Sequence, residues 1–257
     1  MTAIHPSSVV DPAAMLHPGV EVGPFCHIGP DVEIGGGTRL IGHVTIFGPT
    51  RIGEGNIIYP YCSIGQRSQD LKYKSEPTYL EIGNNNSFRE FCTVNRGTLP
   101  GTKTIIGSQG NFLAYSHVAH DCVVGDHVIF SNNGTIAGHV IVEDHAIIGG
   151  LSGVHQFCRI GRHAIIGGCT KVVQDVPPYM IADGNPAEIR GINQVGMERC
   201  GISAEATRAL REAYRLLYRS NLNVKQACEK IAVEQSGPEV IANLLEFITS
   251  SQRGIVR

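Results

Sequence analysis

Four histidines and one glutamine gather in one stretch of this chain of 257 residues. They are His117, His120, His139, His155 and Gln156. Imidazole titrates near neutral pH, so a histidine can take a proton from an alcohol while that alcohol attacks an activated carbonyl carbon. His120 is the residue that we expect to act as this general base.

Two neighbours could assist His120. Asp121 follows it directly and could orient the imidazole ring. Neighbouring side chains of a strand point to opposite faces, however, so this contact needs a bend in the chain. Gly138 offers a backbone N–H with no side chain to obstruct it, which suits the stabilisation of an oxyanion.

A repeat of six residues explains how these side chains can meet. In steps of six from Ile4 to Val172, every position carries a bulky apolar residue except Asp70, Glu76 and Pro100. This period fits neither a helix nor an ordinary strand, and it predicts a β-solenoid whose apolar residues return to one interior. Three hexads would make one coil, so residues about 18 apart stack on successive coils at about 4.8 Å.

The stacking rule predicts that the histidines lie on one side of the solenoid. His120, His139 and His155 belong to hexads that are one coil apart. We therefore expect imidazoles from successive coils to converge along one edge, with His117 at the preceding corner and Gln156 beside His155. A single histidine is usually inert, whereas packing alone does not require such a stacked set.

Glycines and interruptions modify the repeat. Glycine often follows the apolar position directly, as at Gly23 and Gly125. Because glycine adopts positive φ without steric cost, we expect these residues to form the turn of each hexad. Residues 66–81 and 98–105 interrupt the repeat without changing its phase, so they should bulge outward as loops. Such loops either carry binding groups or are tolerated surface decoration.

Composition limits the class of protein. A net charge of −2 gives no general attraction to nucleic acid or to membrane surfaces. Neither a signal peptide nor a membrane span is expected. Five cysteines occupy inward positions of the hexads, where we expect them to be reduced and to serve as packing residues. Reduced thiols are typical of a cytoplasmic protein. Because these thiols face inward, we expect that the attack on the carbonyl carbon transfers its acyl group directly, without a covalent acyl-enzyme. The five cysteines are Cys26, Cys62, Cys92, Cys122 and Cys158.

The pattern changes after residue 178, and residues 179–257 are expected to form a small helical domain. Residues 203–220 have an apolar and a basic face, and capping boxes at Asn223 and Ser236 predict two further helices. The basic face is either a solvated helix surface or a landing surface for an acidic partner. Its residues are Arg208, Arg211, Arg215 and Arg219.

Four long segments match a known family. They are SHVAHDCVVG, NNGTIAGHV, GGLSGVHQFCRIG and AIIGGCTKVVQDVPPYMIADGNPAEIRGIN. Over essentially its whole length the chain resembles the hexapeptide-repeat UDP-N-acetylglucosamine 3-O-acyltransferases of lipid A biosynthesis. The resemblance implies a mainly β fold, with a left-handed parallel β-helix over residues 1–178 and an α-helical domain over residues 179–257. It also implies a homotrimer with active sites between neighbouring solenoids.

The resemblance further implies an activity. A 3-hydroxyacyl group would pass from acyl carrier protein to the glucosamine 3-position of UDP-N-acetylglucosamine, with no cofactor. The family's roles fall on His120 as general base and on Gly138 as oxyanion donor, while Asp70 and Lys72 match its sugar-site loop. The matching pocket residues are His117, His139, His155 and Gln156.

Some positions that match the family also depart from it. Asn193 and Arg199 match its nucleotide-binding segment, where a guanidinium can bind two oxygens of a diphosphate. Val195 stands where an acid is common, and it cannot accept a hydrogen bond. Asn95 stands where histidine is common, which leaves open whether the acceptor is a 3-hydroxyl or a 3-amine. Gly168 leaves space where some members shorten the acyl pocket, so we expect a longer hydroxyacyl chain.

Three other hypotheses stay open at this stage. A metal hydrolyase of the γ carbonic anhydrase type would use His117, His120 and His139 as zinc ligands across a trimer interface. An N-acyltransferase of the same pathway carries an additional N-terminal domain, whereas the hexads here begin at Ile4. A non-catalytic hexapeptide scaffold would predict that His120→Ala changes nothing measurable.

Overall fold

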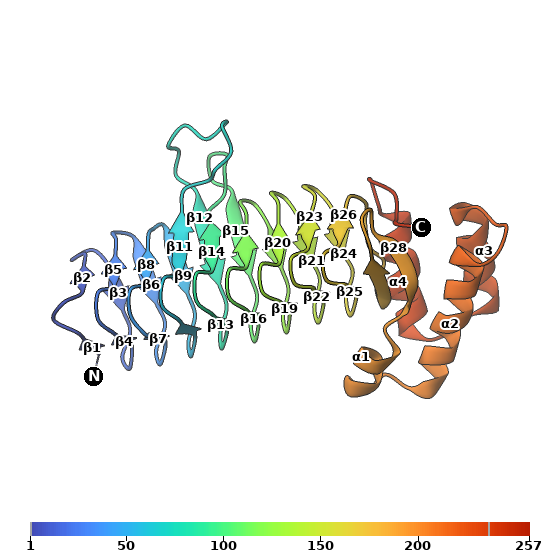
Figure 1. The fold of residues 1–257 in the computed structure, drawn as a ribbon, viewed down its shortest axis with the longest axis horizontal. Coiled ribbons are helices and arrows are strands. Elements are labelled where there is room, and N and C mark those ends of the chain that lie inside the picture. Colours follow the sequence, from blue (N-terminus) through green and yellow to red (C-terminus); the bar gives the residue numbers. More distant parts are fainter. Residues whose placement is uncertain (1, 236) are drawn as a thin grey trace.

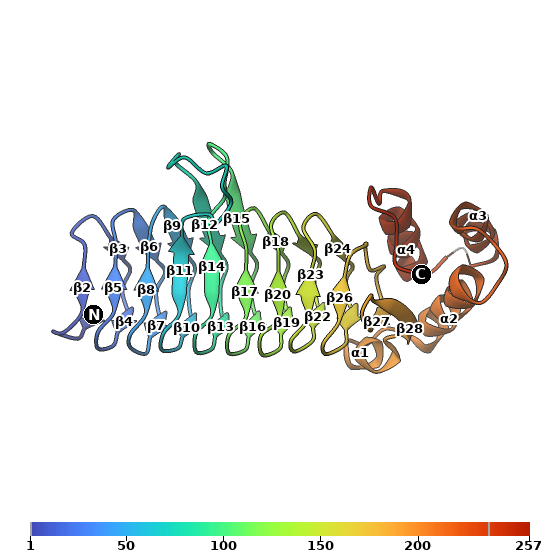
Figure 2. The same cartoon turned by 45° about the horizontal axis from the view of Figure 1, so that its top comes forward.

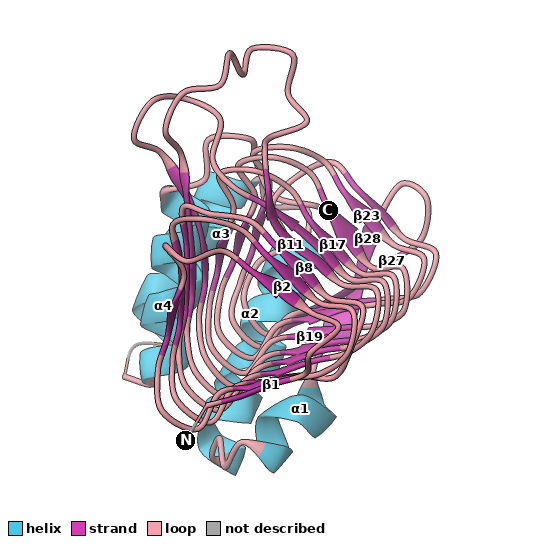
Figure 3. Cartoon of the chain, turned by 90° about the vertical axis from the view of Figure 1, so that its left-hand side faces the viewer, coloured by secondary structure: helices cyan, strands magenta, loops and turns pink. Residues whose placement is uncertain are grey.

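The computed structural model describes residues 2–235 and 237–257. They form a left-handed parallel β-helix of triangular cross-section, and helices follow at its C-terminal end (Figures 1 and 3). The fold expected from the six-residue repeat and from the family resemblance is confirmed. Most strands have only two residues, so the corners between the three sheets make up much of each coil.

Each side of the triangle is one sheet. In spatial order the first sheet consists of β1 (Ala3–Ile4), β4 (Glu21–Val22), β7 (Arg39–Leu40), β10 (Ile57–Ile58), β13 (Ser87–Phe88), β16 (Asn111–Phe112), β19 (Ile129–Phe130), β22 (Ile147–Ile148), β25 (Ile165–Ile166), β27 (Met180–Asp183) and β28 (Glu188–Ile192). The second consists of β2 (Val9–Val10), β5 (His27–Ile28), β8 (Thr45–Ile46), β11 (Ser63–Gln66), β14 (Thr93–Asn95), β17 (His117–Val118), β20 (Thr135–Ile136), β23 (Gly153–Val154) and β26 (Lys171–Val172). The third consists of β3 (Met15–Leu16), β6 (Val32–Ile34), β9 (Thr50–Ile52), β12 (Tyr79–Ile82), β15 (Lys103–Ile106), β18 (Val123–Val124), β21 (Ile141–Val142) and β24 (Arg159–Ile160).

Successive coils stack in the predicted register. His117 of β17 lies beside Thr135 of β20, which lies beside Gly153 of β23. The apolar residues of the repeat point inward, and all of them in the coils from β4 onward are buried. Ile4 is 48% exposed, because no described coil covers its N-terminal side. The core is therefore one continuous column of aliphatic and aromatic side chains along the helix axis.

The prediction that glycines after the apolar positions form the turns is wrong. In most hexads positive φ occurs three residues after the apolar position, usually at other residue types such as Phe91 (φ 62°) and Tyr115 (φ 64°). Gly65 (φ 73°) is an exception among the predicted glycines. These glycines are instead required by close approach, since a Cβ on Gly23 would lie 2.2 Å from the carbonyl oxygen of Ile41 in the next coil.

Two loops leave the β-helix where the repeat is interrupted, and they rise side by side from one edge (Figures 1 and 2). The first joins β11 to β12, and the second joins β14 to β15. Ile52 of β9 lies beside Ile82 of β12, which lies beside Ile106 of β15. The core therefore returns in phase after each loop, and the loops stand on an undisturbed scaffold.

The C-terminal part adds helices to the end of the solenoid. They are α1 (Gln194–Arg199), α2 (Ala204–Tyr218), α3 (Val224–Glu234) and α4 (Glu239–Thr249). The first sheet continues through β27 and the antiparallel β28, past the boundary expected at residue 178. The capping box predicted at Asn223 opens α3. Pro238 precedes α4 without a side-chain cap, and Ser236, the expected cap, lies outside the described residues.

Two further expectations concern the burial of the cysteines and membrane-spanning segments. The five cysteines assigned to inward positions are buried free thiols, as expected. In the described parts of the chain, no helix combines the length and the apolar character needed to cross a membrane.

Candidate active site

His120 lies at the corner between β17 of the second sheet and β18 of the third. Its Nδ1 is 2.8 Å from Oδ2 of Asp121, and only 12% of its side chain is exposed. Asp121 has a φ of 59°, so the backbone turns at this residue and both side chains reach the same side. The bend that this contact needs is therefore present.

Hydrogen bonds keep Asp121 ionised. Burial would raise the pKa of Asp121, but hydrogen bonds with His120, Thr102 and Thr98 outweigh burial and lower this pKa to about 2. The backbone N–H of Thr98 donates to the carboxylate at 3.1 Å, and the backbone N–H of Asp121 donates to Oγ1 of Thr104 at 2.8 Å. An ionised carboxylate accepts from a protonated Nδ1, which leaves Nε2 of His120 as the basic nitrogen.

The backbone of Gly138 packs against the imidazole ring of His120. A Cβ on Gly138 would lie 2.3 Å from Cε1 and 2.5 Å from Nε2 of His120, so the imidazole rests on the glycine backbone. Among the described backbone hydrogen bonds, none uses the N–H of Gly138. His139 follows, with its ring stacked on Phe157 at a centroid distance of 4.7 Å and its Nε2 3.8 Å from Oδ2 of Asp121. A base and an unused backbone donor thus share one corner.

The first loop reaches this corner. Oδ2 of Asp70 lies 4.0 Å from Nε2 of His120, and Oδ1 of Asp70 accepts from the backbone N–H of Lys72 at 2.8 Å. The Lys72 side chain is exposed. Asn95 is buried, and its Nδ2 donates to the carbonyl oxygen of Arg67 at 2.9 Å. Asn95 therefore anchors the loop that carries Asp70 and Lys72.

The other predicted pocket residues follow the same edge. Nδ1 of His117 lies 2.7 Å from a threonine hydroxyl of β14. Burial, and secondly the nearby His120, lower the pKa of His117 and so favour its neutral form. His155 and Gln156 are exposed one coil beyond His139. This edge is an open surface.

The residues matched to nucleotide binding lie at another edge. Asn193 caps α1, and its Nδ2 donates to the carbonyl oxygen of His163 at 2.8 Å. His163 belongs to a corner between the third and first sheets, whereas His120 belongs to a corner between the second and third. Arg199 is the last residue of α1 and is exposed. A single chain does not bring Asn193 and Arg199 beside His120.

Two further positions are also distant from His120. Val195 is 59% exposed in the first turn of α1. Gly168 lies at the corner between the first and second sheets, where a Cβ would meet only the carbonyl oxygen of Gly150 at 3.5 Å. The space expected at Gly168 is therefore present.

Two features escaped the sequence reasoning. A hydrogen bond of 2.6 Å between the hydroxyls of Ser68 and Thr98 ties the two loops together, and no spacing rule signals it. His127, His145 and His163 stack in a second column, with centroid distances of 4.6 and 4.7 Å. These histidines are 18 residues apart, so the stacking rule applied to every histidine would have found them.

His120, Asp121 and His139 also form a group whose possible metal-ligand atoms lie within 4.8 Å of one another. Nδ1 of His120 and the Asp121 carboxylate are already joined by a hydrogen bond. His117, which the γ carbonic anhydrase hypothesis requires, does not belong to this group in one chain. The arrangement favours proton transfer over metal binding.

Known proteins with similar sequences and structures point to one activity. A family model described as UDP-N-acetylglucosamine O-acyltransferase, domain 2, matches residues 175–256. The acyl-[acyl-carrier-protein]–UDP-N-acetylglucosamine O-acyltransferases of Burkholderia lata and Thermodesulfovibrio yellowstonii are 49% and 47% identical to the chain, each over 100% of both sequences. The solved structure of LpxA from Acinetobacter baumannii is similar with a TM-score of 0.94 and 48% identity, over 99% of each chain.

Proposed function

Because the chain belongs to the acyl-[acyl-carrier-protein]–UDP-N-acetylglucosamine O-acyltransferase family, we propose that it performs the first step of lipid A biosynthesis. A 3-hydroxyacyl chain moves from acyl carrier protein to the glucosamine 3-position of UDP-N-acetylglucosamine. The observation that carries this proposal is the 2.8 Å contact of His120 with Asp121, directly over Gly138. The relatives are named O-acyltransferases, which favours a hydroxyl acceptor over the 3-amine.

The geometry supports a general-base mechanism. Nε2 of His120 removes the proton of the sugar 3-hydroxyl as the oxygen attacks the thioester carbonyl carbon. The N–H of Gly138 stabilises the charge that develops on the carbonyl oxygen. The carbon–sulfur bond then breaks, and the imidazolium gives its proton to the sulfur that leaves with the carrier. Asp121 holds the ring in place and stabilises the imidazolium.

The thiol nearest to His120 in the sequence supports direct transfer. Cys122 is fully buried, and burial raises its pKa to about 12. Its Sγ lies 3.1 Å from the carbonyl oxygen of Ala137. A protonated thiol without access to substrate is a poor nucleophile. The acyl group therefore passes to the sugar without a covalent intermediate on Cys122.

Mass spectrometry tests the reaction and the base together. With a mixture of hydroxyacyl carrier proteins and UDP-N-acetylglucosamine, the wild-type chain should yield an O-acylated sugar nucleotide, also when a 3-amino UDP-sugar competes as acceptor. His120→Ala should lower the rate roughly 10²- to 10⁴-fold while the protein remains folded. His127→Ala is the matched control, because His127 is an exposed histidine of the other column. A near-normal rate in His120→Ala would refute the assigned role, and preference for a 3-amino UDP-sugar would refute the hydroxyl acceptor.

The assembly that we propose is a homotrimer whose site is shared by two chains. Asn193 and Arg199 lie at a different edge from His120, so one chain holds only part of the family's site. Placing the His120 edge of one solenoid against the edge of the next solenoid that carries Asn193 and Arg199 completes the site and covers the exposed histidines.

Mixed trimers test this arrangement. His120→Ala and Arg199→Ala chains, each inactive alone, are co-expressed in equal amounts. If each site takes His120 from one chain and Arg199 from its neighbour, about a quarter of the sites carry both native residues and activity recovers to about that fraction. If both residues came from the same chain, no site would recover. Mixed trimers seen by native mass spectrometry without activity therefore contradict a shared site.

The proposed partner, acyl carrier protein, would dock on α2. All four arginines of the basic face of α2 are exposed. Arg215 is paired with Glu212 at 2.6 Å, and Arg211 donates to Gln194 at 2.8 Å. Arg208 and Arg219 are the remaining cations that can meet an acidic surface. The free thiols of the described residues fit a reducing compartment, which supports the cytoplasm as the location.

A further inference from the structure

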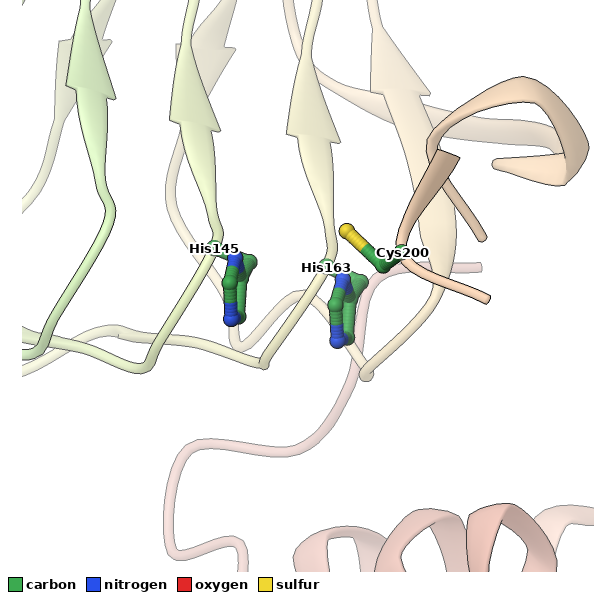
Figure 4. Close-up of side chains that lie close together, drawn as sticks. All are labelled: His145, His163 and Cys200. Atoms are coloured by element: carbon green, nitrogen blue, oxygen red, sulfur yellow. The ribbon is translucent and has the colours of Figure 1, made fainter. Parts of the chain in front are cut away.

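A second group of metal-ligand side chains, His145, His163 and Cys200, lies close together (Figure 4). Its histidines stand at the corner between the third and first sheets, a different corner from that of His120 in the same chain. The rings of His145 and His163 stack there, with centroids 4.7 Å and planes 3° apart. Cys200, the C-cap residue of α1, directs its thiol toward them (Figure 4). One ligand atom from each of the three lies within 4.8 Å of the other two.

We propose that His145, His163 and Cys200 bind a divalent transition-metal ion such as zinc, with water in the fourth position. Two imidazoles and a thiolate are a donor set that zinc and cobalt accept in tetrahedral geometry. The acyl transfer uses none of these three side chains, so the proposal does not depend on that reaction. The ion would join the solenoid to α1.

The three groups are available for binding. Among the described residues, the structure shows no hydrogen bond to the ring nitrogens of His145 and His163 or to the thiol of Cys200. Burial and the neighbouring imidazoles lower the pKa of His145 and also that of His163, the latter to about 4. Arg162 acts in the same direction, and Asp144 opposes it. Neutral imidazole is the form that binds a metal, so protons compete weakly at this corner.

Binding needs the three side chains to approach one another and at least one imidazole ring to rotate. Zinc lies about 2.0–2.1 Å from nitrogen and about 2.3 Å from sulfur, so donor atoms of a tetrahedral site lie roughly 3.3–3.7 Å apart. The present separations of up to 4.8 Å therefore have to shorten by about 1 Å. The rings of His145 and His163 lie in parallel planes, so their nitrogen lone pairs do not converge on one point, and at least one ring has to rotate out of the stack. A shift of the exposed Cys200 supplies the remaining approach. Asn193 already fixes the other end of α1 to the carbonyl oxygen of His163, so a metal ion would clamp α1 at both ends.

Metal titration of the full chain, reduced and without a histidine tag, tests the site. Cobalt should bind with a thiolate-to-metal charge-transfer absorption, and zinc should displace it and protect Cys200 from a thiol reagent. Cys200→Ser should abolish the absorption and lower the zinc affinity on the order of 100-fold. Cys169→Ser is the matched control, because Cys169 is also an exposed thiol and should leave both readouts unchanged.

Three results would overturn the proposal. The wild-type chain could show no cobalt–thiolate absorption, or Cys200→Ser could bind zinc as tightly as the wild type. Zinc binding could also be lost in His139→Gln but kept in Cys200→Ser, which would place the ion at the corner of His120. None of these measurements uses acyl transfer, so failure of the metal site and failure of the enzymatic proposal are distinguishable.

Discussion

Gly138→Ala should displace the general base while keeping the backbone donor. The new Cβ would lie 2.3 Å from Cε1 and 2.5 Å from Nε2 of His120. Ordinary contact needs about 3.4 Å, so the ring must recede by about 1 Å. That shift also strains the 2.8 Å contact of Nδ1 with Asp121. A misplacement of about 1 Å costs roughly 10²-fold in rate, so we expect kcat to fall about 100-fold.

Steady-state kinetics with acyl carrier protein and UDP-sugar measure this effect. The KM for UDP-N-acetylglucosamine should change little, because the clash is confined to the His120 ring and the Gly138 N–H is retained. Gly191→Ala is the matched control, since a Cβ there meets nothing within 4 Å and should leave kcat and the unfolding midpoint unchanged. If Gly138→Ala keeps kcat within about threefold of the wild type, the ring does not act from the position over Gly138.

Three further predictions address charge and pocket shape. Because the folded pKa of Asp121 is lowered to about 2, its contribution to stability is complete above about pH 4 and is lost as pH falls toward 2. Urea unfolding should show about 2 kcal/mol of this acid-dependent stability in the wild type, and its persistence in Asp121→Asn would contradict the assignment. Reversing Arg208 and Arg219 to glutamate should raise the KM for acyl carrier protein roughly tenfold at low salt without changing the KM for UDP-sugar. An unchanged KM for the carrier would show that the basic face of α2 is only a solvated helix surface. Gly168→Met should shift the preferred product toward shorter hydroxyacyl chains in a competition followed by mass spectrometry, and an unchanged product distribution would remove Gly168 from the acyl pocket.

The stacking of the coils could be predicted because burial forces it. Each apolar residue of the repeat has to face the interior, and three hexads close one turn, so residues 18 apart become neighbours. His117, Thr135 and Gly153 pair in this way. The interruption after β11 could also be placed, since Ile82 resumes the register beside Ile52. The loops could thus be located, although their internal contacts could not.

The conformation of the corners could not be predicted from residue types. Glycine is the usual signal for positive φ, yet here Asp121 and His139 adopt it with φ of 59° and 61°. In most coils the geometry imposes this conformation on the residue three places after the apolar one, whatever its type. The glycines serve the close approach of neighbouring coils, as at Gly23. Helix α1 was also missed, because six residues give too short a pattern.

The corner geometry explains why Asp121 and not another residue can hold His120. Side chains at the positive-φ position stack in parallel across coils, as His139 does on Phe157 with planes 9° apart. His120 stands one residue earlier, and its ring is nearly perpendicular to that of His139, at 89°. Asp121 occupies the stacking position one coil before His139, and its carboxylate turns back to Nδ1 of His120. The base is therefore positioned by a carboxylate at the corner, and replacing Asp121 with an aromatic residue should extend the stack of His139 and Phe157 while releasing His120.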